Sequence, residues 1–198
     1  DQGKELHLTE YRKRLPDIPR WSPANNQVIF YNGKQMEYLD VSPQPPAGPS
    51  PFICYPLGDK IYFENTISGE KREFQPFPDA VYLNVILAPD DAHVAFEVYG
   101  GNCYVLNLKT SELTDLGRGN YPGWSPDGRY VVYMFAQDDG HRYTASDIYI
   151  SDTSGKLTQN LTSEIDQIAM YPCWSPRENK IAFSTYDLGT IEVIDFVQ

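Results

Sequence analysis

The chain has 198 residues, of which 41% are hydrophobic and 14% aromatic, and its formal net charge is −11 at pH 7. An acidic surface repels phosphate groups, so this balance argues against nucleic acid as a partner. No apolar stretch approaches the roughly 20 residues of a membrane-spanning helix, so no membrane span is expected. With 15 Tyr, 16 Pro and 14 Gly, the composition favours a chain of short strands and tight turns around a hydrophobic core.

Three cysteines are scattered along the chain, at Cys54, Cys103 and Cys173. They are odd in number and form neither a Cys-x-x-Cys pair nor a Cys/His spacing, so neither a disulfide framework nor a metal site is indicated. We expect them to be small buried residues, and we expect no cofactor. The chain begins at Asp1, without an initiator Met or an apolar signal segment, which favours a mature or trimmed form of a longer precursor.

The tripeptide Trp-Ser-Pro first occurs at 21–23 and recurs at 124–126 and 174–176. Five residues after each proline stands a β-branched residue, and two residues later an aromatic residue, as in Val28-Ile29-Phe30. The same offsets identify two weaker copies. Self-similarity at intervals of roughly 40 residues is the signature of a repeat fold. The five anchoring prolines are Pro23, Pro56, Pro89, Pro126 and Pro176.

Each unit has the pattern of a four-stranded antiparallel sheet. The residue at the Trp position ends a first strand, and Ser125-Pro126-Asp127-Gly128 has turn chemistry, because proline presets φ and glycine tolerates a positive φ. The apolar run after the turn predicts a second strand covered on both faces. An alternating third strand and a polar edge strand follow, as at 147–150 and 157–161. Such a unit is the blade of a β-propeller, in which radial repetition protects the strand edges.

The two ends of the chain complement each other. The last unit stops after its third strand, at 191–197, with no edge strand left. The N-terminal segment 3–9 is similar in sequence to 155–162, the edge strand before the third Trp-Ser-Pro. We therefore predict an all-β fold: a single five-bladed β-propeller domain over residues 1–198, closed by the N-terminal strand that completes the last blade.

The first two units are the least regular. The segment from Pro43 to Pro51 stands where the first unit should have its edge strand, and proline cannot donate to a strand ladder. In the second unit, the segment from Glu64 to Phe77 shows no clean division into two strands. We expect a missing or irregular outer strand in the first unit, and the strand layout of the second unit stays open.

The segment 121–133, with Trp124-Ser125-Pro126-Asp127-Gly128 at its centre, resembles the WD-like, Pro-Asp repeat of the TolB-type β-propeller family. Segments 146–152 and 160–162 are similar to the later strands of that repeat. The resemblance covers almost the whole chain in spacing, best in the fourth unit and least in the second. It implies a propeller in a periplasmic or otherwise extracytoplasmic location. Propellers of this type usually have six blades and a separate N-terminal domain, so the family's partners are not carried over.

The longest connection between a second and a third strand is 136–146, in the fourth unit. In a propeller such loops share one face around the channel mouth with the loops that join the blades, and loops on a rigid scaffold carry function. The mixed charges here suit a polar ligand or partner, and a solvated hairpin tip is the alternative. A calcium site through the two acids lacks the further ligands of a calcium loop. The candidate residues are Asp138, Asp139, His141, Arg142 and Tyr143.

Two further candidates, Tyr121 and Tyr171, stand at matching positions three residues before Trp124 and Trp174. We place these tyrosines near the inner end of each blade, where they either contact a sugar or a partner at the channel mouth or fill the ring. The tryptophans, together with Trp21, are predicted to pack between blades.

An enzyme reading requires paired carboxylates. Asp79 and Asp166 share a register in the connections that precede their blades, and Asp17 lies in the corresponding connection of the first unit. Acids about 5–10 Å apart would suit a glycosidase. No GxSxG, HExxH or P-loop motif occurs. The favoured function is therefore a non-catalytic, monomeric binding scaffold for a protein or glycan partner, and the alternative is a glycosidase-like enzyme that uses these three carboxylates.

Overall fold

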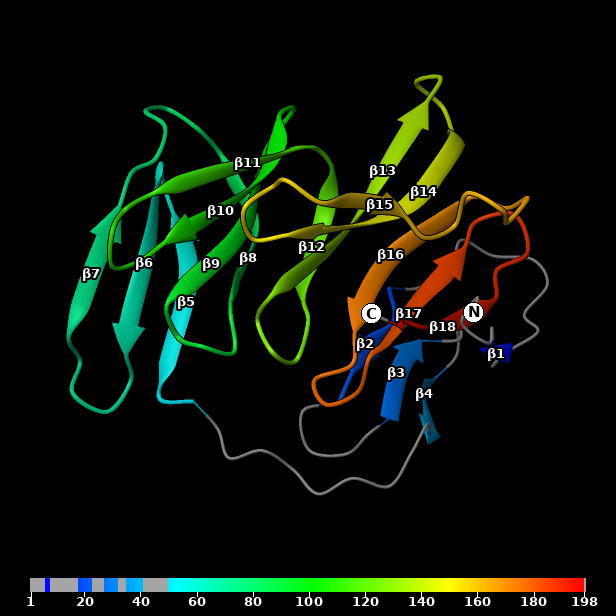
Figure 1. The fold of residues 1–198 in the computed structure, drawn as a ribbon, viewed down its shortest axis with the longest axis horizontal. Helices are drawn as coiled ribbons and strands as arrows, with labels where there is room; N and C mark the ends of the chain where they lie inside the picture. The colour runs from blue at the N-terminus through cyan, green and yellow to red at the C-terminus, as the bar shows by residue number, and fades with distance from the viewer. Residues whose placement is uncertain (1–5, 8–17, 23–26, 32–34, 41–49, 198) are drawn as a thin grey trace.

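The computed structural model describes residues 6–7, 18–22, 27–31, 35–40 and 50–197. Within these residues the chain forms strands β1 to β18 and no helix (Figure 1). The strands pair into five separate antiparallel sheets. The described chain is therefore all-β, as predicted, and it holds no helix that is long and apolar enough to cross a membrane.

The sheets follow one another along the chain, and neighbouring strands within a sheet are consecutive in sequence except at β1. The first sheet comprises β2 (Arg20–Trp21), β3 (Gln27–Tyr31) and β4 (Met36–Asp40), and the second comprises β5 (Phe52–Leu57), β6 (Lys60–Asn65) and β7 (Lys71–Phe74). The third comprises β8 (Tyr82–Leu87), β9 (His93–Val98), β10 (Asn102–Asn107) and β11 (Leu113–Arg118). The fourth comprises β12 (Asn120–Trp124), β13 (Tyr130–Asp138), β14 (Tyr143–Asp152) and β15 (Thr158–Asn160). The fifth comprises β16 (Ala169–Trp174), β17 (Lys180–Thr185), β18 (Ile191–Asp195) and β1 (Leu6–His7).

The N-terminal strand β1 is the outer strand of the last sheet. It pairs antiparallel with β18, with Leu6 opposite Val193 and His7 opposite Glu192. The two ends of the chain therefore share one sheet, as the similarity between the N-terminal segment and a later edge strand predicted.

Apolar cores lie between neighbouring sheets. Successive residues of a strand point to opposite faces, so Val94 and Phe96 of β9 face the second sheet, whereas Ala95 faces the fourth. Further cores join the fourth sheet to the fifth and the fifth to the first. Representative buried residues of the four cores are, in that order, Ile61 with Phe96, Val105 with Val131, Ile148 with Phe183, and Phe30 with Val193.

The five sheets form an arc in Figure 1 and do not close into a ring. The four cores link them in the order second, third, fourth, fifth and first, and the described residues form no such core between the first sheet and the second. Tyr38 of β4 and Leu57 of β5 are instead 58% and 64% exposed. The connecting residues 41–49, where the sequence predicted an irregular edge strand, lie outside the described residues. The predicted closed ring is therefore not what the described residues form.

The Ser-Pro-Asp-Gly segment of the fourth sheet forms the expected turn. The amide of Ser125 donates to the carbonyl of Tyr130 (2.9 Å), and the amide of Gly128 donates back to Ser125 (3.0 Å). Gly128 has a φ of 70°, which a residue with a Cβ adopts at a cost. The side chain of Asp127 accepts the Ser125 hydroxyl at 2.7 Å and fixes the turn from within.

The tryptophans of the repeat tie neighbouring sheets together. Trp124 donates its indole N–H to the carbonyl of Ile86 on the third sheet (2.9 Å), and Trp21 donates to the carbonyl of Cys173 on the fifth (2.9 Å). Trp124 and Trp174 are buried, and Trp21 packs against the core between the fifth and first sheets. The prediction that these side chains pack between sheets is confirmed.

Pro56 does not lie in a turn. It lies within β5 opposite Ile61, and the β5–β6 hairpin turns over Gly58 and Asp59. The offset rule matched here because a β-branched residue stands at the right distance, although Asp-Gly is absent after the proline. The prediction that Pro56 anchors a turn like the other copies is therefore wrong. The anchoring prolines that do lie at turns or bends among the described residues are Pro89, Pro126 and Pro176.

The irregular segment from Glu64 to Phe77 holds one strand of its own, β7, after a turn at 66–70. The second sheet accordingly has three strands among the described residues, which settles a layout that the sequence left open.

All three cysteines are free. Cys103 is buried and Cys54 and Cys173 are partly buried, so the expectation of buried cysteines holds fully for one of the three and in part for the other two. Burial raises the pKa of the Cys54 thiol to about 12, with a further contribution from the charge of Asp91. A thiol with such a pKa is protonated at neutral pH and is a poor nucleophile.

Candidate functional site

Strands β8, β12 and β16, which are the first strands of the third, fourth and fifth sheets, share a backbone irregularity near their first residues. Asn84, Tyr121 and Tyr171 have φ values of 47°, 54° and 54°, in the left-handed region that bulky side chains rarely adopt. In each strand the ladder shifts register around this residue. A β-bulge of this kind redirects a side chain, and such strain is concentrated at functional sites. The sequence showed that the positions match, but it gave no signal of the bulge.

The amides at two of these bulges reach the neighbouring sheet. The amide of Tyr121 donates to the carboxylate of Glu97 on β9 (2.8 Å), and the amide of Tyr171 meets the sulfur of Met134 on β13 (3.3 Å). Glu97 is only 4% exposed. The bulge is therefore held by the sheet before it, which fixes where each tyrosine side chain points.

Four tyrosines of the fourth and fifth sheets form two ring pairs against the core between these sheets. The rings of Tyr121 and Tyr171 meet edge to face, with centroids 4.7 Å apart. Tyr143 and Tyr186 form a second edge-to-face pair at 5.7 Å. All four pack against the core between the two sheets. We call these four residues the tyrosine cluster.

Burial shapes the chemistry of the tyrosine cluster. It raises the pKa of Tyr171, and Tyr143 adds to the shift through its charge and a side-chain hydrogen bond. Burial also raises the pKa of Tyr121, with a further contribution from Glu97. Both phenols are therefore neutral over the physiological range. They offer ring faces and hydroxyl groups rather than charge, and such groups suit sugars and polar protein surfaces.

The predicted loop 136–146 is mostly a β-hairpin. β13 extends to Asp138 and β14 starts at Tyr143, so the hairpin reaches beyond its neighbours (Figure 1). Asp139 caps the tip: its Oδ1 accepts the amides of His141 and Arg142, both at 3.0 Å. These two amides lower the pKa of Asp139. The prediction of a long loop is corrected to an ordered hairpin, whose tip we define as residues 138–142.

The structure divides the predicted binding residues into two groups. Tyr121, Tyr143 and Tyr171 come together in the tyrosine cluster. The four other predicted residues lie at the exposed tip, where Asp139 and Arg142 approach each other at 3.8 Å. Sequence reasoning missed Tyr186, which directly follows β17, because its place depends on the packing of two sheets. The residues at the tip are Asp138, Asp139, His141 and Arg142.

The carboxylates of the catalytic alternative are only partly described. Asp17 lies outside the described residues. Asp79 is exposed between β7 and β8, with a φ of 58°, and Asp166 is exposed between β15 and β16. Their convergence stays a prediction. Among the described residues, no group of three or more His, Cys, Asp or Glu side chains could hold a metal ion.

No family model matches the chain. Solved structures do resemble it. TolB from Acinetobacter baumannii is 16% identical, with a TM-score of 0.51, and the match covers 94% of this chain and 54% of that one. The Cps50 (Swd1) β-propeller domain of Myceliophteria thermophila is 10% identical, with a TM-score of 0.51 and coverages of 90% and 52%. A nidogen/laminin complex is 12% identical, with a TM-score of 0.50 and coverages of 67% and 52%.

These likenesses show the fold alone. The chain is similar to β-propeller proteins, TolB among them, and it spans about half the length of the matched chains. At such low identity the similarity assigns no site or partner.

Proposed function

We propose that the chain is a non-catalytic binding scaffold, which uses the tyrosine cluster and the β13–β14 tip to bind a protein or a glycan outside the cytoplasm. The observation that carries the proposal is the pair of bulged tyrosines, Tyr121 and Tyr171. Each holds a left-handed φ, which costs about 1–3 kcal/mol for a residue with a side chain. Asn84 has the same bulge without an aromatic ring, so the bulge belongs to the repeat. Binding is supported because two of these positions carry tyrosines, whose partly buried rings meet with centroids 4.7 Å apart.

The tip adds recognition by charge to the tyrosine cluster. Asp138, His141 and Arg142 are exposed on a capped and extended hairpin, so they reach a partner without loss of order. Rigid aromatic anchors surrounded by adaptable polar groups are typical of protein-binding surfaces. The match to a nidogen/laminin complex supports a propeller as a protein-binding scaffold. The resemblance to TolB-type repeats supports the extracytoplasmic location.

We further propose that the five sheets close into one monomeric ring over residues 1–198. The support is the exposure at the two ends of the arc. Tyr31, Met36 and Tyr38 of the first sheet are 47%, 49% and 58% exposed, and Ile53 and Leu57 of the second are 44% and 64% exposed. The same kinds of residue are buried at the four formed junctions. Contact between these two faces would remove their apolar surface from water, at about 25 cal/mol per Å².

The test of the binding proposal combines a glycan array with capture of partners from the extracytoplasmic proteins of the source organism. The key variant is Asp138→Ala/His141→Ala/Arg142→Ala, because these exposed side chains can be removed without opening the core. The matched control is Lys156→Ala/Gln159→Ala, in exposed positions near the other end of β14.

We expect a specific partner that the tip variant loses and the control retains. A second pair, Tyr121→Phe and Tyr171→Phe, removes only hydroxyl groups and should weaken the same binding by about 0.5–1.5 kcal/mol each. Equal binding by the tip variant, the tyrosine variants and the control would refute the proposal and would move attention to Asp17, Asp79 and Asp166.

A further inference from the structure

A pocket lies on the face of the fourth sheet that is opposite the tyrosine cluster. It occupies about 250 Å³ and is lined by Arg118, Tyr133, Phe135, Tyr149 and Thr158. Tyr133 and Tyr149 belong to the core between the third and fourth sheets, whereas the tyrosine cluster packs against the core between the fourth and fifth. The two sites therefore lie on opposite faces of one sheet, and we call this one the rim pocket.

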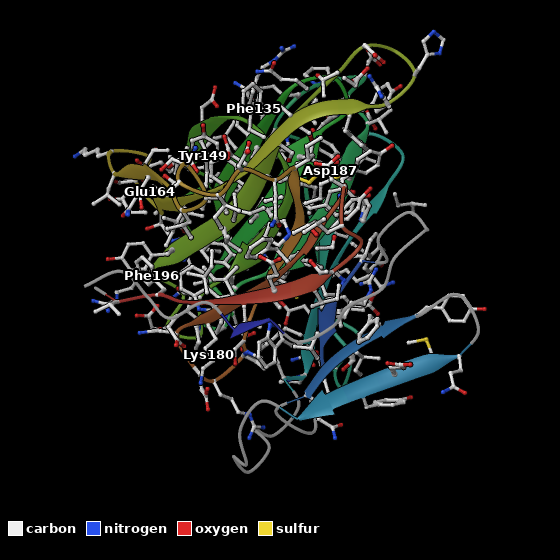
Figure 2. All side chains as sticks on the ribbon, turned by 90° about the vertical axis from the view of Figure 1, so that its right-hand side faces the viewer. Phe135, Tyr149, Glu164, Lys180, Asp187 and Phe196 are labelled. Carbon is white, nitrogen blue, oxygen red and sulfur yellow. The ribbon has the colours of Figure 1, made fainter. Side chains whose placement is uncertain are left out.

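The rim pocket has a rigid aromatic lining. Tyr133 and Tyr149 are cross-strand partners whose rings stack with centroids 6.0 Å apart, and Phe135 meets Tyr149 at 6.4 Å and 69°. Figure 2 labels Phe135 and Tyr149 side by side on β13 and β14. Tyr133 is 2% exposed, and its hydroxyl donates to the carbonyl of Leu116 (3.2 Å). Tyr133 is thus a fixed floor, and the two partly buried rings form a wall.

The approach of the third sheet to this floor depends on one glycine. A Cβ at Gly119 would overlap the ring of Tyr133. The backbone after β11 therefore lies directly on the aromatic floor, and it brings the preceding residue, Arg118, to the edge of the pocket. The third sheet therefore places the guanidinium of Arg118, and the fourth sheet places the aromatic wall of Phe135 and Tyr149.

Arg118 is the polar feature of the rim pocket. Its exposed side chain makes no hydrogen bond, ion pair or ring contact with the residues that the structure describes. Two other arginines are engaged: Arg72 donates to the carbonyl of Leu108 and stacks over Phe74, and Arg129 pairs with Asp127. The net charge of −11 repels anions at a distance, so it is the unneutralised guanidinium at the pocket that favours an anion there.

The aromatic wall favours a six-membered ring as the bound group, because both a planar aromatic ring and the C–H face of a sugar ring gain dispersion energy when they pack on an aromatic face. The planar fork of a guanidinium matches a carboxylate with two parallel hydrogen bonds. Asp147, the cross-strand partner of Phe135, does not line the pocket, and its carboxylate accepts the hydroxyl of Thr162 at 2.9 Å. Its charge is therefore partly satisfied elsewhere.

From these features we propose that the rim pocket binds a six-membered ring that carries a carboxylate, with the ring against Phe135 and Tyr149 and the carboxylate on Arg118. A uronic acid residue of a glycan and an aromatic carboxylic acid share this chemistry. The proposal does not depend on the function assigned to the tyrosine cluster, because it rests on a different face of the sheet.

The experiment titrates the whole chain with four probes and follows the amide signals by NMR. Glucuronate is compared with glucose, and benzoate with benzyl alcohol, so each acid has a neutral partner of similar size. Both the signals of Arg118 and those of β13 and β14 should shift. We expect at least one acid to bind about tenfold more tightly than its neutral partner, a ratio that corresponds to about 1.4 kcal/mol. Binding of glucuronate would identify the ligand as a uronic acid residue of a glycan, and binding of benzoate would identify it as an aromatic carboxylic acid.

Three variants separate the parts of the rim pocket. Arg118→Gln should remove the preference for the acid, and Tyr149→Leu should weaken both members of a pair. Lys109→Gln removes one positive charge from an exposed residue outside both sites and should change nothing at the rim pocket. Because Arg118 is exposed, its variant should melt like the unchanged chain.

The proposal is overturned if neither acid binds, if neutral and acidic probes bind alike, or if Arg118→Gln binds the acids as the unchanged chain does. Loss of acid binding in Lys109→Gln to the same degree as in Arg118→Gln would also overturn it, since the effect would then follow net charge and not the pocket.

Discussion

Replacement of Trp124 by alanine is expected to destabilise the fold strongly. The side chain is 8% exposed in the core between the third and fourth sheets, and truncation of a buried tryptophan costs about 3–5 kcal/mol. The carbonyl of Ile86 also loses its donor, which adds about 1 kcal/mol. For a chain of this length each kcal/mol lowers Tm by roughly 2–4 °C. Trp124→Ala should therefore lower Tm by roughly 6 °C or more.

The assay is thermal unfolding followed by far-ultraviolet circular dichroism, which does not depend on tryptophan as the probe. Trp174 supplies an internal comparison, because its indole N–H has no hydrogen-bond partner among the described residues. Trp124→Phe should therefore cost about 1 kcal/mol more than Trp174→Phe, which is the net value of one hydrogen bond. An unchanged Tm for Trp124→Ala would refute its place in the core, and equal losses for the two Phe variants would refute the role of the indole bond.

Three further predictions concern the ends, the rim and the tip. Deletion of residues 1–9 removes β1 from the fifth sheet and should lower Tm; a truncated chain that melts like the full one would contradict the pairing in solution. Gly119→Ala should cost about 1–3 kcal/mol in urea unfolding, because the new Cβ meets the ring of Tyr133; an unchanged midpoint would show that the ring moves freely. The folded pKa of Asp139 is lowered, so its hold on the tip is complete above the ordinary carboxyl pKa of about 4 and fades as pH falls through the lowered value. Asp139→Asn at neutral pH should therefore speed hydrogen exchange at the His141 amide. After correction for the intrinsic exchange rate, the unchanged chain should lose the same protection only in acid. Equal protection of this amide in the variant and in the unchanged chain at neutral pH would refute the capping role of Asp139.

Local chemistry explains what could be predicted from the sequence. The turn at Ser125 to Gly128 depends on residues within one short segment. The tryptophan that precedes the turn fills a core in the fourth sheet, as Trp124, and again in the fifth, as Trp174. The N-terminal strand was found for the same reason, because its sequence matches another edge strand. Pro56 shows the limit of such reasoning. A fixed offset from the proline does not distinguish a turn that contains the proline from a tight hairpin that begins two residues after it. Only the pairing of Pro56 with Ile61 shows that the second sheet has the tight hairpin.

Contacts between sheets explain what could not be predicted. The left-handed φ of Tyr171 follows from a register shift and from the packing of its amide on Met134 of the preceding sheet. The rim pocket unites Arg118 of one sheet with Phe135 of the next, and no sequence spacing relates them. The candidate residues near Tyr143 were found because an unusually long connection is visible in the sequence, although its hairpin form is not.

The most direct test of the proposed binding face is hydrogen exchange measured by mass spectrometry on the chain with and without its captured partner. The account predicts slowed exchange in the peptides that contain the tip 138–142 and Tyr171, with no change around Lys156. Protection centred on Lys156 or on the outer strands, with the tip and Tyr171 unaffected, would contradict the account.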